Sequence, residues 1–248
     1  MLRARRLATA VVVASLTVGG LAACRSEPTV AAYLGDTERV SEQQVQEIWD
    51  EAYDVLAENP APPAEGEQAK PVQVPFTRGD VVHALVTREL LGQVAGQHGV
   101  TLPAQMPYEE GAAQIQLPPD LQYVRLYVDN LVLRNQLMEK VQTSTPPADD
   151  DLRLVYDTLA ANGGVQPGQT FETWKSEQVT DQNKQVVATA AVLRDELEAA
   201  AEDLSVKVNP RYQPYEVNLL QVNDGTNSLD LLSAEFGEDQ SVPVADVS

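Results

Sequence analysis

The sequence has a single cysteine, Cys24, and only two histidines in 248 residues. One cysteine excludes an internal disulfide, so packing and hydrogen bonds must hold the fold together. His83 and His98 are 15 residues apart in the sequence. Because structural zinc needs four such ligands at close spacing, the sequence excludes a Cys/His cluster for zinc or iron.

Basic and aromatic residues are also scarce. Lys and Arg number 17 against 37 Asp and Glu, a formal net charge of -20, and three of the Arg lie in the first six positions. Since nucleic-acid binding needs a basic face that releases phosphate counterions, we expect no nucleic-acid partner. Aromatic residues make up 5% of the chain, whereas Ala, Val, Leu, Gln and Glu are abundant. That composition favours helices over a strand-rich sandwich.

The longest apolar run lies at the N-terminus. The basic stretch Met1–Arg6 precedes about 15 apolar or small residues that end at Leu21, which is the organisation of a secretory signal. The run is shorter than the roughly 20 residues of a membrane-spanning helix, so a cleaved signal is favoured over a permanent span. The next residues match the bacterial lipobox: Leu21, Ala22, Ala23 and Cys24.

The resemblance to a lipobox implies that residues 1–23 are a lipoprotein signal peptide and that Cys24 receives a diacylglyceryl group on its sulfur. Acylation of the new N-terminus, for example by palmitate, usually follows, and two or three acyl chains anchor a protein stably. The expected location is the outer face of the cytoplasmic membrane. A free Cys24 after an ordinary secretory signal is the alternative. Cleavage would leave 14 basic against 37 acidic side chains, a net charge of -23.

Downstream of Cys24 the patterns predict a tether at 24–30, a mostly helical body at 31–222 and a disordered acidic tail at 223–248. The Pro-rich stretch 59–75 predicts a flexible insertion within the body. Helices are expected over about 41–58, 77–99, 120–142, 149–161 and 170–204, and strands over 31–34, 206–212 and 216–222.

Apolar spacing indicates how three of these helices pack. The second helix, capped by Thr77, has apolar residues at every fourth position, which share one face. The third helix is apolar on two faces, so we expect it to pack on two sides. The last helix has a seam typical of long packed helices. The apolar face of the second helix consists of Val82, Val86, Leu90 and Val94. The seam of the last helix consists of Val179, Val186, Ala190, Leu193 and Leu197.

The strands at the two ends of the body can pair, Ala31–Leu34 with Val206–Tyr212, and close the helical middle. This order of elements resembles the N-terminal domain of SurA-type extracytoplasmic chaperones, and specifically actinobacterial lipoproteins with a SurA-like N-terminal domain. The resemblance implies a mainly α, multi-helix fold with a small pairing of N- and C-terminal strands. The insertion at 59–75 departs from the shared pattern, and no segment corresponds to the parvulin isomerase domains of SurA. The segments that carry the resemblance are 21–24, 31–36, 40–45, 151–156, 170–174 and 206–212.

Motifs for catalysis or cofactor binding are incomplete. The segment Gly163–Thr170 is close to a phosphate loop, but Gln169 replaces its lysine and a helix precedes it. His83 and His98 would lie about 22 Å apart along a helix, too far to share a metal. The acidic run Asp149–Asp151 has no central glycine, so it indicates a helix start and not a calcium loop. We therefore expect neither an enzyme nor a protein that binds a cofactor, metal or nucleotide.

The candidate client groove consists of Tyr123, Tyr127 and Met138, because aromatic side chains and Met adapt to varied apolar partners. Burial in the core is the alternative, and it is favoured for Trp49 and Trp174. The first hypothesis is a lipid-anchored chaperone or holdase that binds unfolded or exported polypeptides without isomerase activity. The alternative is a non-catalytic scaffold or assembly lipoprotein that holds one envelope partner, and an enzyme ranks third.

Overall fold

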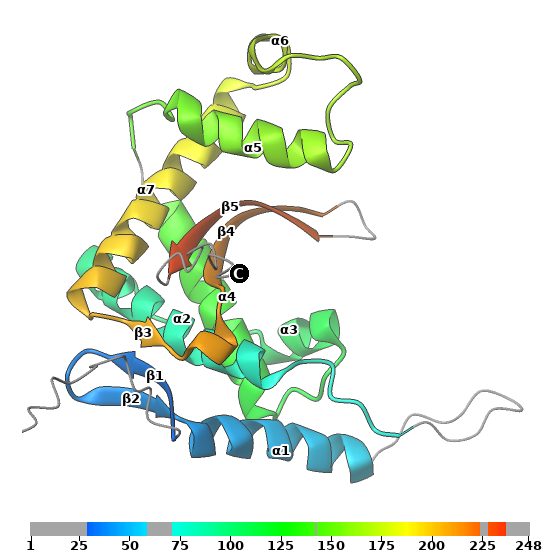
Figure 1. The fold of residues 1–248 in the computed structure, drawn as a ribbon, viewed down its shortest axis with the longest axis vertical. Helices are drawn as coiled ribbons and strands as arrows, with labels where there is room; N and C mark the ends of the chain where they lie inside the picture. Colours follow the sequence, from blue (N-terminus) through cyan, green and yellow to red (C-terminus); the bar gives the residue numbers. More distant parts are fainter. Residues whose placement is uncertain (1–28, 59–70, 142, 224–227, 237–248) are drawn as a thin grey trace, which may run out of the picture.

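The computed structural model describes residues 29–58, 71–141, 143–223 and 228–236. The expected signal peptide, the expected lipobox and most of the expected tether lie outside these residues. The described part is mainly helical, as expected, with seven α-helices and small antiparallel strand pairings (Figure 1). None of its helices is both long and apolar enough to cross a membrane. In chain order the elements are β1 (Val30–Leu34), β2 (Glu38–Ser41), α1 (Glu42–Glu58), α2 (Arg78–His98), α3 (Tyr108–Ile115), α4 (Gln122–Lys140), α5 (Asp149–Ala161), α6 (Phe171–Glu177), α7 (Asp181–Asp203), β3 (Lys207–Val208), the 3-10 helix η1 (Pro210–Tyr212), β4 (Tyr215–Asn223) and β5 (Ser228–Phe236).

A three-stranded sheet in the order β2-β1-β3 joins the two ends of the helical body. Ala32 pairs with Val208 and Tyr33 pairs with Lys207 in antiparallel register, which confirms the expected pairing of the terminal strands. The strand expected over 206–212 is shorter in the structure, where β3 ends at Val208. Pro210 has no amide proton to donate to a sheet, and it starts η1 instead. The sequence analysis missed β2, which pairs with β1 across a turn at Gly35. The φ of Gly35 is 76°, in the left-handed region that favours glycine.

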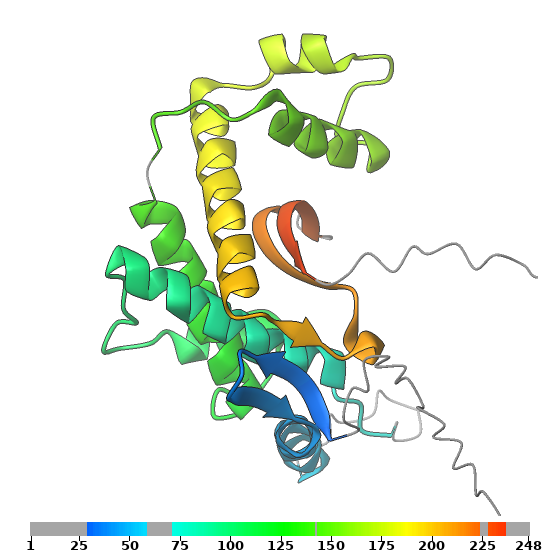
Figure 2. The ribbon, with the colours of Figure 1, turned by 60° about the vertical axis from the view of Figure 1, so that its left-hand side comes forward.

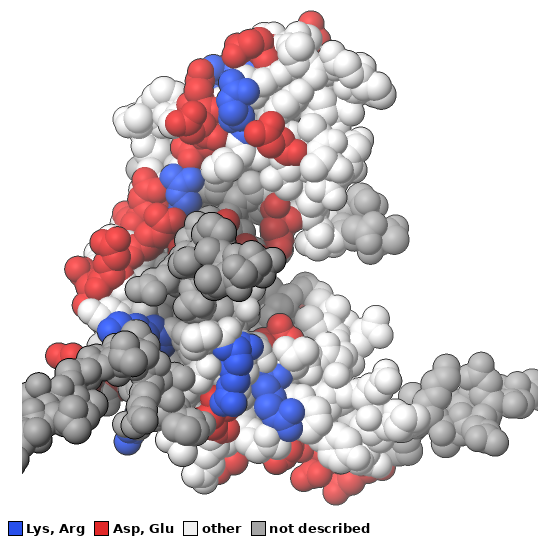
Figure 3. Space-filling model, viewed as in Figure 1, with Lys and Arg blue, Asp and Glu red and all other residues white. Residues whose placement is uncertain are grey.

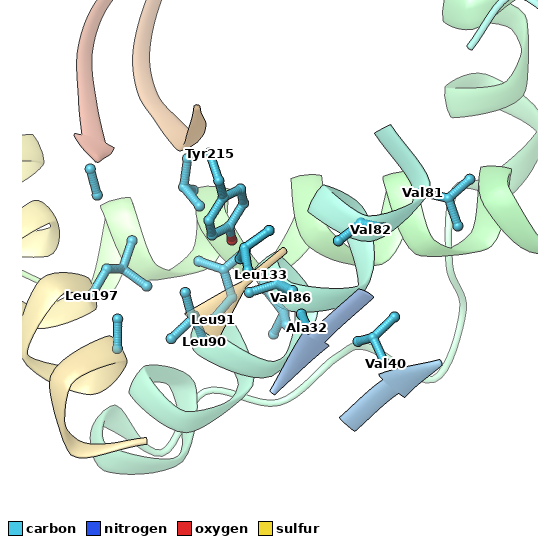
Figure 4. Packing of buried hydrophobic residues seen from close by; sticks show 14 of the residues in the cluster. Ala32, Val40, Val81, Val82, Val86, Leu90, Leu91, Leu133, Leu197 and Tyr215 are labelled. Carbon is cyan, nitrogen blue, oxygen red and sulfur yellow. The ribbon is translucent and has the colours of Figure 1, made fainter. Parts of the chain in front are cut away.

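Helices α2, α4 and α7 cross around the main hydrophobic core (Figures 1 and 2). The Thr77 hydroxyl accepts the Asp80 amide at 3.2 Å, and the Asp80 carboxylate accepts the Thr77 amide at 2.7 Å, so the expected cap of α2 is confirmed. Gly99 ends the helix with a φ of 63°. Figure 4 shows α2 side chains against Leu133 of α4, Leu197 of α7 and Tyr215. The four residues expected on one face of α2 are all fully buried: Val82, Val86, Leu90 and Val94.

Helix α4 is buried on both of its expected faces, and a helix that the sequence analysis did not anticipate covers part of it. Val124 and Val128 are buried on one face of α4, and Leu137 on the other. Helix α3 packs closely against α4 at Gly111, where a Cβ atom would lie 2.2 Å from a methyl carbon of Val128. Only glycine permits this approach, so the residue that weakens α3 as an isolated helix lets it dock.

The single long helix expected over 170–204 is wrong, because the chain forms two helices there, α6 and α7. The Thr180 hydroxyl accepts the Asn183 amide at 3.1 Å and caps the second helix. The seam holds for Ala190, Leu193 and Leu197, which are fully buried, whereas Val186 is 38% exposed. The second half of α7 packs against the main core, whereas its first turns, which follow the break, lie outside that core.

The disordered tail expected at 223–248 is wrong for residues 228–236, which form β5. β5 pairs with β4 along most of its length and packs against α5 and α7. Its residues Leu231, Leu232 and Ala234 are buried. The body thus extends to Phe236, beyond the expected limit at residue 222. Residues 71–75 are the described end of the expected flexible insertion. This end contacts the folded body, because Val74 packs against the main core.

Candidate functional site

The three residues expected to line a client groove pack against the main core instead: Tyr123, Tyr127 and Met138. The Tyr123 ring stacks on Phe76 with ring centroids 3.7 Å apart. Burial raises the pKa of the Tyr123 hydroxyl to about 12. Trp49 donates its indole proton to the Phe76 carbonyl at 3.3 Å, and Trp174 is buried in the small cluster described below. Tyr123, Tyr127 and Met138 do not line the apolar groove described in the next paragraph.

An apolar groove of about 360 Å³ opens where α5, α6 and the start of α7 meet the β4-β5 hairpin. Its volume lies within the range of about 300–1,000 Å³ that is usual for binding sites. We call it the apolar groove. It is lined by Leu152, Val155, Leu159, Gly164, Trp174, Gln178, Val179, Thr180, Gln182, Asn183, Val186, Val187, Leu220, Val222 and Leu231.

The lining is uncharged although the chain as a whole is strongly acidic. None of the described residues around the groove is Asp, Glu, Lys or Arg. Acidic side chains run instead along α7 on the left of the view in Figure 3. Val186 is 38% exposed and Val222 is 46% exposed, and both border the groove. Exposed valines around an uncharged hollow suit an apolar side chain of another polypeptide.

A second hydrophobic cluster forms one wall of the groove. We call it the small cluster, and it comprises Leu152, Val155, Phe171, Trp174, Val187 and Leu231. The Tyr156 ring packs edge-on against Phe171 with centroids 5.7 Å apart. Its hydroxyl donates to the Gln169 carbonyl at 2.6 Å, which ties the loop between α5 and α6 to α5. The small cluster therefore packs α5 and α6 against α7 and β5, apart from the main core.

Three of the four polar side chains that line the groove hold the corner between α6 and α7. The side-chain amide nitrogen of Gln178 donates to the side-chain oxygen of Gln169 at 3.1 Å. Thr180 and Asn183 bond to each other as the cap of α7. These three side chains thus have partners within the chain, which leaves the apolar atoms and Gln182 as the main binding surface.

The hairpin that closes the groove is anchored at its base in the main core. The Tyr215 and Thr87 hydroxyls lie 3.0 Å apart and share a hydrogen bond, and burial raises the pKa of the Tyr215 hydroxyl. Arg134 of α4 donates to the Asn218 carbonyl of β4 at 3.1 Å. Farther along the hairpin, Leu231 reaches the small cluster. The hairpin thus connects the two hydrophobic clusters.

An ion pair between Asp151 and Arg194 fastens α5 to α7. The guanidinium donates to the Asp151 carboxylate at 2.7 Å and to the exposed Asp195 carboxylate at 2.8 Å. The Asp151 side chain is 12% exposed and that of Asp195 is 67% exposed. Burial by itself lowers the pKa of Arg194, but the hydrogen bonds to the Asp151 and Asp195 carboxylates and their negative charges together outweigh it and raise the pKa.

Replacing Asp151 with Ala should destabilise the protein by about 1–3 kcal/mol, because Arg194 then loses a half-buried, charge-assisted hydrogen bond. Chemical unfolding measures the loss, and hydrogen exchange should show it concentrated in α5. Asp195→Ala is the matched control and should cost less than about 1 kcal/mol, as exposed ion pairs do. Equal losses in the two variants would show that burial of the pair contributes nothing.

The described residues hold no group of three or more His, Cys, Asp and Glu that could bind a metal. His83 lies 2.7 Å from the Tyr212 carbonyl, and His98 lies 2.8 Å from the Glu196 carboxylate. The glycine-rich segment before α6 is a loop, and Thr170 caps that helix as expected. Asp149–Asp151 form the first turn of α5, also as expected.

The sequence analysis missed Val186 and Val222, the two exposed residues that border the apolar groove, and favoured the core for Trp174, which is buried and also lines the groove. Val186 was assigned to a helical seam, and Val222 to a strand for which no partner was named. The available signal was the Asn-Asp-Gly sequence at 223–225, which is typical of a hairpin turn. That signal would have predicted β5 and, with it, a second side to the groove. No family model, curated protein or solved structure matches this chain.

Proposed function

We propose that the protein is a lipid-anchored, extracytoplasmic holdase that binds unfolded or exported polypeptides without catalysing a reaction. The observation that supports it best is the uncharged, apolar groove bordered by exposed Val186 and Val222. The lipobox at 21–24 supports the location. The proposal includes the resemblance of the order of elements to SurA-type chaperones, which is consistent with the same class of function.

The occupant we propose is one or two large apolar side chains of an extended client segment. The groove is too small to enclose a folded partner, and its apolar lining lacks the charges that would select one sequence. Binding of this kind is weak and reversible, and it lowers the concentration of unfolded clients that can aggregate. The net charge of the chain keeps holdase and client complexes soluble.

The test uses a soluble form without residues 1–23 and with Cys24→Ser, mixed with several unrelated unfolded proteins whose aggregation is followed by light scattering. The parent should suppress aggregation at up to equimolar amounts. Val186→Glu and Val222→Glu should each weaken client binding by about tenfold or more, because an unpaired carboxylate then faces the apolar groove. Leu154→Glu is the matched control, since Leu154 is 53% exposed on α5 and does not line the groove.

Two outcomes would contradict the proposal. If the parent suppresses no aggregation but retains one envelope protein from a membrane extract, the scaffold hypothesis replaces the holdase. If Leu154→Glu weakens binding as much as the groove variants, the apolar groove is not the binding site. Circular dichroism of every variant separates these outcomes from loss of folding.

A further inference from the structure

A row of two cations and one aromatic ring crosses the outer face of the β2-β1-β3 sheet. Tyr33 pairs with Arg39 of β2 and with Lys207 of β3. Side chains at paired positions of antiparallel strands point to the same face, so the order across the sheet is Arg39, Tyr33, Lys207. Arg39 and Lys207 are exposed, and Tyr33 is half-buried. We call these residues the cationic row.

The other face of the same sheet is buried. Ala32 pairs with Val40 and with Val208, and all three are buried against the main core. Figure 4 shows Ala32 and Val40 on the side of the sheet that faces α2. Because side chains alternate along a strand, the cationic row points away from the core. Glu38 alternates to the face opposite Arg39, and Asp36 lies in the turn beyond the row.

The chain length before β1 limits how far this sheet can lie from a membrane. Cys24 precedes Val30 by six residues, which span at most about 20 Å when fully extended. The cationic row lies three residues farther along β1, about 10 Å from Val30. A lipid on Cys24 would therefore keep the cationic row close to the headgroups.

Charge selects between the two surfaces that begin near Val30. Helix α1 starts beside it, because the Glu42 amide donates to the Thr29 carbonyl at 2.9 Å. The exposed face of α1 is acidic and would be repelled by anionic lipids: Glu47, Asp50, Glu51 and Asp54. The sheet presents cations instead, and Figure 3 shows blue side chains at the end of the molecule where β1 and β3 lie.

We propose that the cationic row is the surface with which the anchored protein lies against an anionic bilayer, an orientation that rests on the proposed lipid at Cys24. Lys and Arg bind anionic headgroups, and an aromatic ring between them suits the interface. Helices α5 and α6 lie at the opposite end of the molecule from this sheet in both ribbon views (Figures 1 and 2). The apolar groove is then held away from the membrane, where exported chains are accessible.

The test places the lipidated mature protein, which begins at Cys24, in vesicles of phosphatidylcholine and phosphatidylglycerol whose acyl chains are brominated. Tyr33→Trp keeps an aromatic ring and adds an emitter, and the unmodified protein supplies the signal of Trp49 and Trp174. The added emission should be quenched severalfold more strongly than that of Leu154→Trp, which reports on α5. Lys207→Glu in the Tyr33→Trp background should reduce this quenching at least by half. Lys140→Glu, the same charge change at the exposed end of α4, should leave it unchanged.

The outcomes separate the orientation from the proposed function. Flotation of the vesicles with equal quenching at positions 33 and 154 would overturn the orientation alone, since the holdase assay uses a soluble form. Quenching that Lys207→Glu leaves unchanged would overturn the role of the cationic row. Protein that does not float with the vesicles would overturn the anchor and the orientation together.

Discussion

Truncation of the chain after Asn223 is expected to unfold the protein, because it removes the strand that pairs with β4 and packs on α7. The lost residues include Leu231, Leu232 and Ala234, and the cut exposes Val217 and Leu219. Each buried leucine contributes about 2–5 kcal/mol, so the total loss is a large share of the 5–15 kcal/mol that usually stabilises a domain.

Thermal unfolding followed by circular dichroism measures this effect. The truncated protein should lose its cooperative transition, bind a hydrophobic dye and aggregate. Truncation after Phe236 is the matched control, because it keeps β5 and removes no contact seen among the described residues. If both truncated forms melt at the temperature of the parent, the hairpin does not contribute to the core.

The second large effect is expected from Cys24→Ser, which should release the protein from membranes completely. A serine oxygen cannot replace the sulfur that the lipobox pattern implies as the site of lipid attachment. None of the described helices could hold the chain in a bilayer instead. Residues outside the described ranges, apart from the expected signal, have no apolar run of the roughly 20 residues that a span requires.

Metabolic labelling with a fatty-acid analogue, followed by separation of membrane and soluble fractions, checks this expectation. The parent should be labelled and sediment with membranes, whereas Cys24→Ser should be unlabelled. Ser26→Ala, two residues downstream, should behave as the parent. A parent protein without label would favour the alternative of an ordinary secretory signal before a free Cys24.

Local patterns determined much of the helical body. Caps and glycine stops act within one turn, so Thr77, Thr170 and Gly99 mark real helix ends. Apolar residues at every fourth position of α2 share one face whatever the partner is, and they are buried. The pairing of the terminal strands followed from the need of each lone strand for a partner, and β1 and β3 do pair.

The sequence was a poor guide where a segment depends on a distant neighbour. Helix α3 is short, and Gly111 weakens it, but close packing against Val128 makes it possible. β5 contains three leucines and one phenylalanine, but it lies in an acidic tail, and only its pairing with β4 and its contact with α7 reveal its buried face. The aromatic residues predicted to line a groove pack against the main core instead, and Tyr123 stacks on Phe76.

By itself, the sequence determined the acidic charge, the mainly helical class and the closure of the body by its terminal strands, because each depends on composition, spacing or hydrogen-bonding needs within short segments. The lipobox stays a prediction from the sequence. Only the tertiary structure decided the apolar groove, since its walls come from α5, α6, α7 and the hairpin. The burial of Tyr123 and the exposure of Val186 likewise depend on contacts between segments far apart in the chain. A side chain's periodicity specifies its face on an element, and the neighbours of that face decide whether it is core or surface.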